Sequence, residues 1–136
     1  MMQMVQSNSS PLTPDEAQQQ FRLAHPGRGT LRIQVSTAGG AFPVPQASVA
    51  VSRAFGGVSR TLYRGVTDIS GILEGISLPA LPDAYSQSAA TAAQSGTDYQ
   101  VSVYHPDFVP VNARPVTIYS DIETILPVVL EPITRI

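Results

Sequence analysis

The feature that most constrains this chain is an alternation of apolar and polar residues that begins near Thr30. Leu31, Ile33 and Val35 alternate with polar neighbours, and the same pattern returns at 47–51 and 99–103. Successive side chains of a β-strand point to opposite faces, so a period of two is typical of strands with one buried face. The pattern indicates short, half-buried strands rather than helices.

Turn signals separate these strands at short intervals. Glycine pairs at 39–40 and 56–57 and the segment Asp68–Gly71 favour tight turns. Closely spaced short strands are typical of a sandwich or barrel rather than an α/β enzyme. We therefore expect an all-β fold, a seven-strand antiparallel Greek-key β-sandwich over residues 30–136. The β segments from which these strands are drawn lie at 31–36, 47–51, 60–67, 72–78, 99–103, 109–111, 116–119 and 122–130, and residues 42–45 are an extended edge segment.

Residues 1–29 have a different character and form a predicted N-terminal arm. Thr13 and Glu16 have the spacing of a capping box, and Pro14 stands at the first helical position. Pro26 disfavours helical geometry at the residue before it. The sequence therefore predicts a short helix at about residues 14–24.

A helix of this length is marginal by itself, so it needs a surface to dock on. That surface is either its own sandwich or a neighbouring molecule, and the sequence leaves both open. Phe21 and Leu23 are the large apolar residues of the helix. We take them as candidate assembly contacts.

The C-terminal strand-like run contains Pro127, which cannot donate a hydrogen bond to a sheet and so predicts an edge strand or a bulge. Open edges pair readily with strands of other chains. Pro127 and Val129 are therefore further candidate assembly residues.

A long segment of small and polar residues spans 79–97. Loops of this length in compact domains are usually functional or disordered. Tyr85, Gln87 and the nearby Tyr99 are candidate ligand contacts, and carbohydrate or peptidoglycan is the ligand class considered.

The composition argues against several classes of partner. Charged residues make up 13% of the chain and the net charge is −2, which gives no case for nucleic acid or an anionic membrane surface. All basic residues are arginine. The absence of lysine reflects either a codon bias or a surface that packs against neighbours.

No catalytic, cofactor or metal site emerges from the sequence. His25 and His105 lack partners at metal-ligand spacing, there is no cysteine, and no serine lies in a nucleophile motif. Carboxylate pairs such as Asp121 and Glu123 fit turns better than a calcium loop. We expect a chain that is not an enzyme.

No run of residues is long and apolar enough to span a membrane. The first residues lack the basic and apolar regions of a secretory signal peptide. We expect an extracellular protein, or one on a cell or spore surface, without a recognisable signal peptide.

From Gly29 to Pro132 the chain resembles the carboxypeptidase regulatory-like domains. Residues 43–49 resemble their P-V-x-G-A-x-V segment, residues 67–71 their T-D-x-x-G turn, residues 76–79 their x-x-L-P segment, and residues 99–108 their Y-x-V-x-V-x-x-P-G-F/Y segment. The last strands, 116–119 and 125–132, read like clostridial forms linked to spores or envelopes. Gln46 and Asp107 stand where the family usually has glycine, so we expect those two turns to be built differently.

The resemblance implies a transthyretin-like (prealbumin-like) sandwich with an accessory, adhesive or structural role and no catalysis. We expect a structural subunit of a surface or extracellular assembly, such as a fibre, appendage or coat, that self-associates through its arm and sheet edges. The expected partners are further copies of the chain in an oligomer or filament. The alternative is an accessory module that binds carbohydrate or peptidoglycan through the 79–97 loop. An enzyme such as a transthyretin-like hydrolase is disfavoured because the chain ends without a serine-rich signature.

Overall fold

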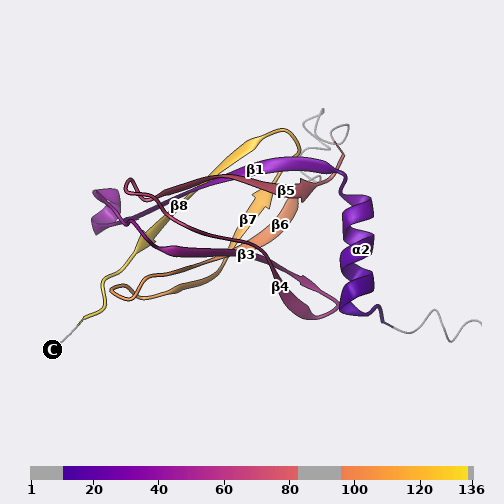
Figure 1. Cartoon of the computed structure of the whole chain (residues 1–136), viewed down its shortest axis with the longest axis horizontal. Helices are drawn as coiled ribbons and strands as arrows, with labels where there is room; N and C mark the ends of the chain where they lie inside the picture. The colour runs from indigo at the N-terminus through magenta and orange to yellow at the C-terminus, as the bar shows by residue number, and fades with distance from the viewer. Residues whose placement is uncertain (1–10, 83–95, 135–136) are drawn as a thin grey trace, which may run out of the picture.

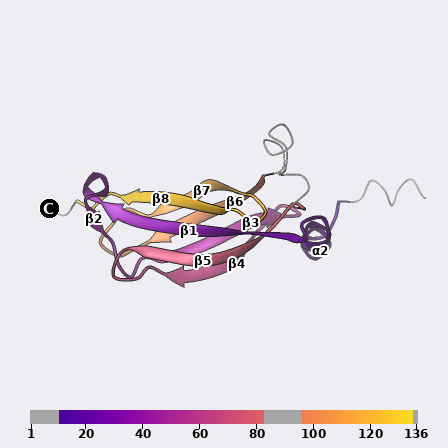
Figure 2. The same ribbon diagram turned by 90° about the horizontal axis from the view of Figure 1, so that it is seen from above.

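The computed structural model describes residues 11–82 and 96–134. Within them, one short helix lies at the end of a two-layer β-sandwich (Figures 1 and 2). The elements are α2 (Pro14–Ala24), β1 (Gly27–Thr37), the 3-10 turn η1 (Ala38–Gly40), β2 (Phe42–Pro43), β3 (Ser48–Phe55), β4 (Val58–Val66), β5 (Ile72–Ala80), β6 (Thr97–Tyr104), β7 (Val111–Ile118) and β8 (Glu123–Leu130).

The strands form two sheets. In the first sheet β1 is central, with β5 and the two-residue β2 on one side and β8 on the other. In the second sheet the order is β4-β3-β6-β7 and every pairing is antiparallel. The all-β sandwich predicted from the alternating pattern is confirmed.

One pairing corrects the expected antiparallel arrangement. β8 runs parallel to β1, in register from Thr30 beside Glu123 to Thr37 beside Leu130. Parallel neighbours need a long connection, and here all the strands between β1 and β8 supply it. The alternating pattern shows which face of a strand is buried, but it carries no information about the direction of the partner.

The inner faces of the two sheets supply the core. The core residues of the strands are fully or almost fully buried and are mainly valine, leucine and isoleucine, at the alternate positions that the sequence indicates. They include Leu31, Ile33, Val35, Val49, Val51, Ile76, Leu78, Val101, Val103, Ile118, Val128 and Leu130.

β7 differs from the sequence prediction. The pattern predicts separate segments at 109–111 and 116–119, whereas the structure has one strand from Val111 to Ile118. Its pairing with β6 shifts register near Ala113, which adopts φ of 54°. The middle of this strand is exposed and carries Pro115. The alternation of apolar and polar residues does not predict this part of the strand, because neither of its faces is buried.

The turn predicted at Asp68–Gly71 is confirmed in detail. The Asp68 carboxylate accepts hydrogen bonds from the backbone N–H groups of Ser70, at 2.9 Å, and Ile72, at 3.0 Å. Gly71 adopts φ of 75° and returns the chain into β5. An aspartate that bonds its own downstream backbone, followed by a left-handed glycine, fixes this reversal.

Gln46 occupies a family glycine position, and its backbone is left-handed with φ of 59°. Thr67 supports this turn, because its hydroxyl accepts from Ala47 N at 2.9 Å and donates to Val44 O at 2.8 Å. A glutamine therefore takes here a conformation that glycine adopts more readily. Asp107, at the other such position, has no positive φ.

The structure settles where α2 docks. Its predicted capping box is present: Thr13 N donates to the Glu16 carboxylate at 2.9 Å, and Glu16 N donates to the Thr13 hydroxyl at 3.2 Å. Phe21 is only 8% exposed and belongs to the core cluster of the sandwich. The helix therefore packs on its own chain and closes one end of the sandwich (Figure 1).

Several side chains hold the Phe21 ring in place. Its centroid lies 5.3 Å from Phe55 and 6.2 Å from Tyr99, both edge-to-face. The ring of His25 stacks on it at 4.0 Å, and the Arg53 guanidinium carbon lies 4.5 Å from its centroid. These contacts join an aromatic cluster to a cation–π interaction.

The surroundings of His25 predict that the stability of the fold depends on pH. Burial lowers the pKa of His25 below its ordinary value of 6.5, and the nearby Arg53 lowers it further, although a hydrogen bond to the Phe21 carbonyl opposes both. That carbonyl only accepts, so Nδ1, 2.7 Å away, carries the proton of the neutral ring. The unfolded chain therefore binds a proton more readily than the folded one.

We predict that the free energy of unfolding falls as the pH drops below about 6.5, since protons then favour the unfolded chain. Urea unfolding at pH 7.5 and pH 5.5 measures this, with His25→Asn as the control that lacks the titrating ring. All other ionisable groups are the same in both proteins, so the comparison rests on the difference between the two losses. Equal losses in wild type and His25→Asn would contradict the assignment.

Candidate functional site: the outer faces of the two sheets

A groove of about 670 Å³ lies on the outer face of the first sheet. It brings together two residues expected from the sequence, Pro127 and Val129, with Ile69 and Ile72. Ile69 is 86% exposed and Val129 is 43% exposed. We call this the first-sheet groove, and its lining includes Ser36, Pro43, Ile69, Ile72, Pro127 and Val129.

β8 makes the floor of this groove apolar because it carries apolar side chains on both faces. Leu126, Val128 and Leu130 point into the core and are buried. Ile125, Pro127 and Val129 alternate with them and are exposed on the outer face. Strands that are apolar on both faces are typical of sheets covered on both sides. In the isolated chain one of those sides is open to solvent.

Sequence reasoning missed Ile69. Ile69 is the second residue of the Asp68–Gly71 turn, and its side chain is exposed instead of pointing into the core. The available signal was an isoleucine at a turn position that polar residues usually occupy.

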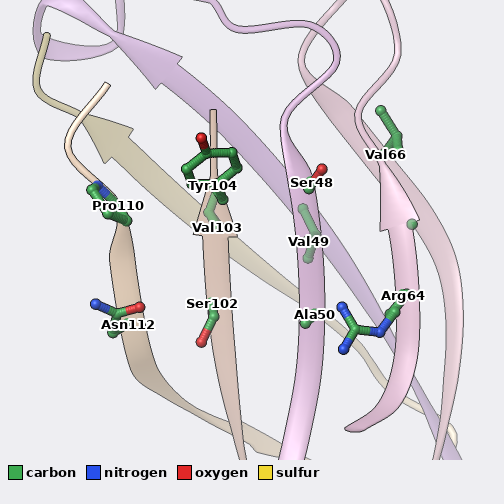
Figure 3. A pocket seen from close by; sticks show the side chains of 11 residues that line it. Ser48, Val49, Ala50, Arg64, Val66, Ser102, Val103, Tyr104, Pro110 and Asn112 are labelled. Atoms are coloured by element: carbon green, nitrogen blue, oxygen red, sulfur yellow. The ribbon is translucent and has the colours of Figure 1, made fainter. Parts of the chain in front are cut away.

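A second hollow, of about 690 Å³, lies on the outer face of the other sheet (Figure 3). Its floor is made of small side chains, since β3 turns Ser48 and Ala50 outward. Ser48 pairs with Tyr104 on one side and with Val66 on the other. The next row across the sheet places Ala50 between Ser102 and Arg64.

Larger side chains stand around this floor. Figure 3 shows Tyr104 and Pro110 on one side of Ser48 and Val66 on the other. Tyr104 is 55% exposed, so its ring is accessible. Arg64 and Asn112 add hydrogen-bond donors to the rim. We call this the second-sheet hollow; it combines one aromatic face with polar groups and one positive charge, that of Arg64.

The candidate ligand residues in and near the 79–97 segment are not among the described residues that line these two surface sites. Tyr85 and Gln87 lie outside the described residues. Tyr99 is 1% exposed, and its hydroxyl donates to the Pro79 carbonyl. Burial raises the pKa of Tyr99 well above its ordinary value, although Arg53 and Arg28 oppose the shift. Its side chain therefore packs in the core instead of facing a ligand.

The two candidate assembly residues of α2 differ in their exposure. Phe21 is buried against the sandwich, whereas Leu23 is 75% exposed on the outer side of the helix. Only Leu23 therefore offers a side chain to a second molecule. Neither lines the first-sheet groove.

Residues 11–82 and 96–134 contain no group of three or more histidine, cysteine, aspartate or glutamate side chains that could hold a metal ion. Over the same ranges no helix has the length and apolar character needed to cross a membrane.

No protein-family model matches this chain, and no curated protein matches it. Several solved structures are similar to it in fold. The Bacillus anthracis TIE protein aligns with a TM-score of 0.54 at 15% identity, over 79% of this chain and 17% of that one. GBS52, the minor pilin of the gram-positive pathogen Streptococcus agalactiae, aligns with a TM-score of 0.53 at 15% identity, over 81% of this chain and 47% of that one.

At this identity the likeness concerns the fold alone. The β-sandwich of this chain is similar to domains found in a pilin and in the TIE protein, and it spans less than half the length of either. The resemblance to carboxypeptidase regulatory-like domains stays a prediction.

Proposed function

We propose that this chain is a non-catalytic structural subunit of a surface or extracellular assembly, such as a fibre, appendage or coat. The observation that carries the proposal is the first-sheet groove with the outer face of β8, where Ile125, Pro127 and Val129 are exposed together. Contiguous apolar surface of this kind marks protein–protein contacts. The sandwich likeness to a minor pilin agrees with this role.

The self-association part of the proposal is tested by measuring size against concentration. We expect sedimentation velocity to show larger species as the concentration rises, and negative-stain electron microscopy to show what they build. Val129→Glu places a charge in the groove, and burying it in a contact is unfavourable. The concentration needed for half-association is expected to rise at least tenfold.

Tyr104→Glu is the matched control, because it adds the same charge on the outer face of the other sheet. It is expected to leave association unchanged. A wild-type chain that remains monomeric at all accessible concentrations would refute the proposal, and equal effects of both variants would refute the role of the groove.

A second candidate is an accessory module that binds carbohydrate or peptidoglycan. The second-sheet hollow favours it, because the exposed Tyr104 ring lies beside a floor of small side chains with donors at Arg64 and Asn112. Sugar rings combine an apolar face with hydroxyl groups, and such a surface offers partners for both. Co-sedimentation with insoluble peptidoglycan tests this. Binding that Tyr104→Ala abolishes and Val129→Glu leaves intact is the expected result.

A further inference from the structure

The edge strands of the two sheets differ in one respect. The edge of a sheet presents unpaired N–H and C=O groups to which another chain can add a strand. Four of the five edge strands contain a proline, which removes one donor: Pro43 in the two-residue β2, Pro79 in β5, Pro115 in β7 and Pro127 in β8. β4, from Val58 to Val66, contains none.

Pro127 lies at a position of β8 where its missing N–H weakens pairing at the open edge of the sheet. Ile122 O accepts from Thr30 N of β1 at 3.0 Å, and Leu130 O accepts from the Thr37 hydroxyl at 2.8 Å. Backbone groups of alternate residues point to the same side of a strand, so even-numbered positions of β8 face β1. Pro127 therefore turns its missing N–H to the open edge.

β4 keeps all its backbone donors. Within the described ranges its strand pairing is with β3 alone. A bulge at Leu62 bends the strand without removing a donor. One of its charges is already matched, because Arg60 contacts the Asp15 carboxylate at 2.8 Å and the Gln18 side chain at 2.9 Å. The edge best able to accept a strand is therefore that of β4.

The sequence of residues 1–10 suits them to such an addition. Residues 1–10 have no charged side chain and no proline, and they are as many as needed to pair with the nine residues of β4. Pro11 favours an extended conformation at the residue before it. An extended uncharged segment adds to a sheet edge without bringing a like charge to Arg64.

The point where this segment joins the sandwich favours a second molecule as the acceptor. Leu12 and Pro14 lie against the tip of the β3–β4 hairpin, since a Cβ built on Gly56 would be 3.1 Å from Leu12 O and 3.0 Å from Pro14 N. From there the described residues before α2 lead away from their own sandwich in both views (Figures 1 and 2).

We propose that residues 1–10 of one copy add as a strand to the open edge of β4 in a second copy. The inference rests on the proposed function, because it names a contact by which the subunits associate. It adds a backbone-paired contact to the apolar one at the first-sheet groove.

The chain has no cysteine, so engineered disulfides report this contact cleanly. One full-length variant carries Val5→Cys and a second carries Thr61→Cys. These residues lie near the middle of the donor segment and of β4, so they approach each other whichever way the added strand runs. Gln6→Cys is made as well, because neighbouring residues face opposite sides of a strand. A control acceptor, Asn112→Cys, lies exposed on β7, the other edge of the same sheet.

The variants are mixed in pairs under mild oxidation and the covalent heterodimer is measured by mass spectrometry. We expect Val5→Cys or Gln6→Cys to link to Thr61→Cys at least tenfold faster than to Asn112→Cys. Equal rates for the two acceptors would overturn the inference. A disulfide that forms only within a single chain carrying both cysteines would overturn it too, because the segment would then cover its own β4.

Sedimentation of the same samples separates this inference from the proposed function. Association without the preferred disulfide leaves the structural-subunit proposal standing and removes the strand addition. Absence of any association removes both. Deleting residues 2–10 is expected to weaken association at least tenfold, while circular dichroism verifies that the sandwich is intact.

Discussion

Gly71→Ala is expected to destabilise the domain by about 3 kcal/mol. Gly71 has φ of 75°, and a left-handed backbone costs an alanine about 1–2 kcal/mol. The added Cβ would also overlap the Val35 carbonyl oxygen and lie 3.0 Å from Val44 N. Overpacking of this kind adds about 1–3 kcal/mol.

Gly39→Ala is the matched control for this prediction. Gly39 has φ of 66°, and no heavy atom lies within 4 Å of a Cβ built on it. Its substitution therefore carries the backbone cost alone, about 1–2 kcal/mol. Urea unfolding followed by circular dichroism gives both values. Equal losses for the two variants would show that the contact with β1 contributes nothing.

Phe21→Ala is expected to cost about 3 kcal/mol, near the lower end for a buried phenylalanine, because the helix lies at the periphery of the core. The substitution removes the ring that Phe55, Tyr99, His25 and Arg53 surround. We expect α2 to detach, since a helix of eleven residues is marginal without packing.

Leu23→Ala, on the exposed side of the same helix, is expected to change the free energy of unfolding by no more than about 0.5 kcal/mol. Urea unfolding compares the two variants, and the far-ultraviolet signal at low urea reports the helix. If the two substitutions cost the same, the docking of α2 through Phe21 is wrong.

The candidate sites were only partly visible in the sequence. Pro127 predicted an edge strand or a bulge, since proline is confined to such positions in a sheet. The structure places Pro127 and Val129 in one groove. Ile69 and Tyr104 were not singled out as surface contacts. Each reaches its site through neighbours that are distant in sequence: Ile69 lines one groove with Pro127 and Val129 of β8, and Tyr104 of β6 pairs with Ser48 of β3.

Tyr99 shows the opposite case. It lies beside the 79–97 segment in sequence, which made it a candidate ligand contact. The structure buries it, because the alternation of β6 turns it inward with Val101 and Val103. The strand pattern was the better guide here, since burial of an aromatic ring outweighs the position of its residue next to a loop.

The sequence by itself determined the local elements of this protein. The α2 capping box, the Asp68–Gly71 turn and the inward residues of β1, β3 and β6 follow from contacts within a few residues and from the two-residue period. Only the tertiary structure decided the parallel pairing of β1 with β8, the docking of α2 on its own sandwich and the continuity of β7. Those features depend on which distant strands become neighbours. The energy that selects them arises between residues up to 93 positions apart, as in the bond from Thr37 to Leu130, and so it leaves no local pattern in the chain.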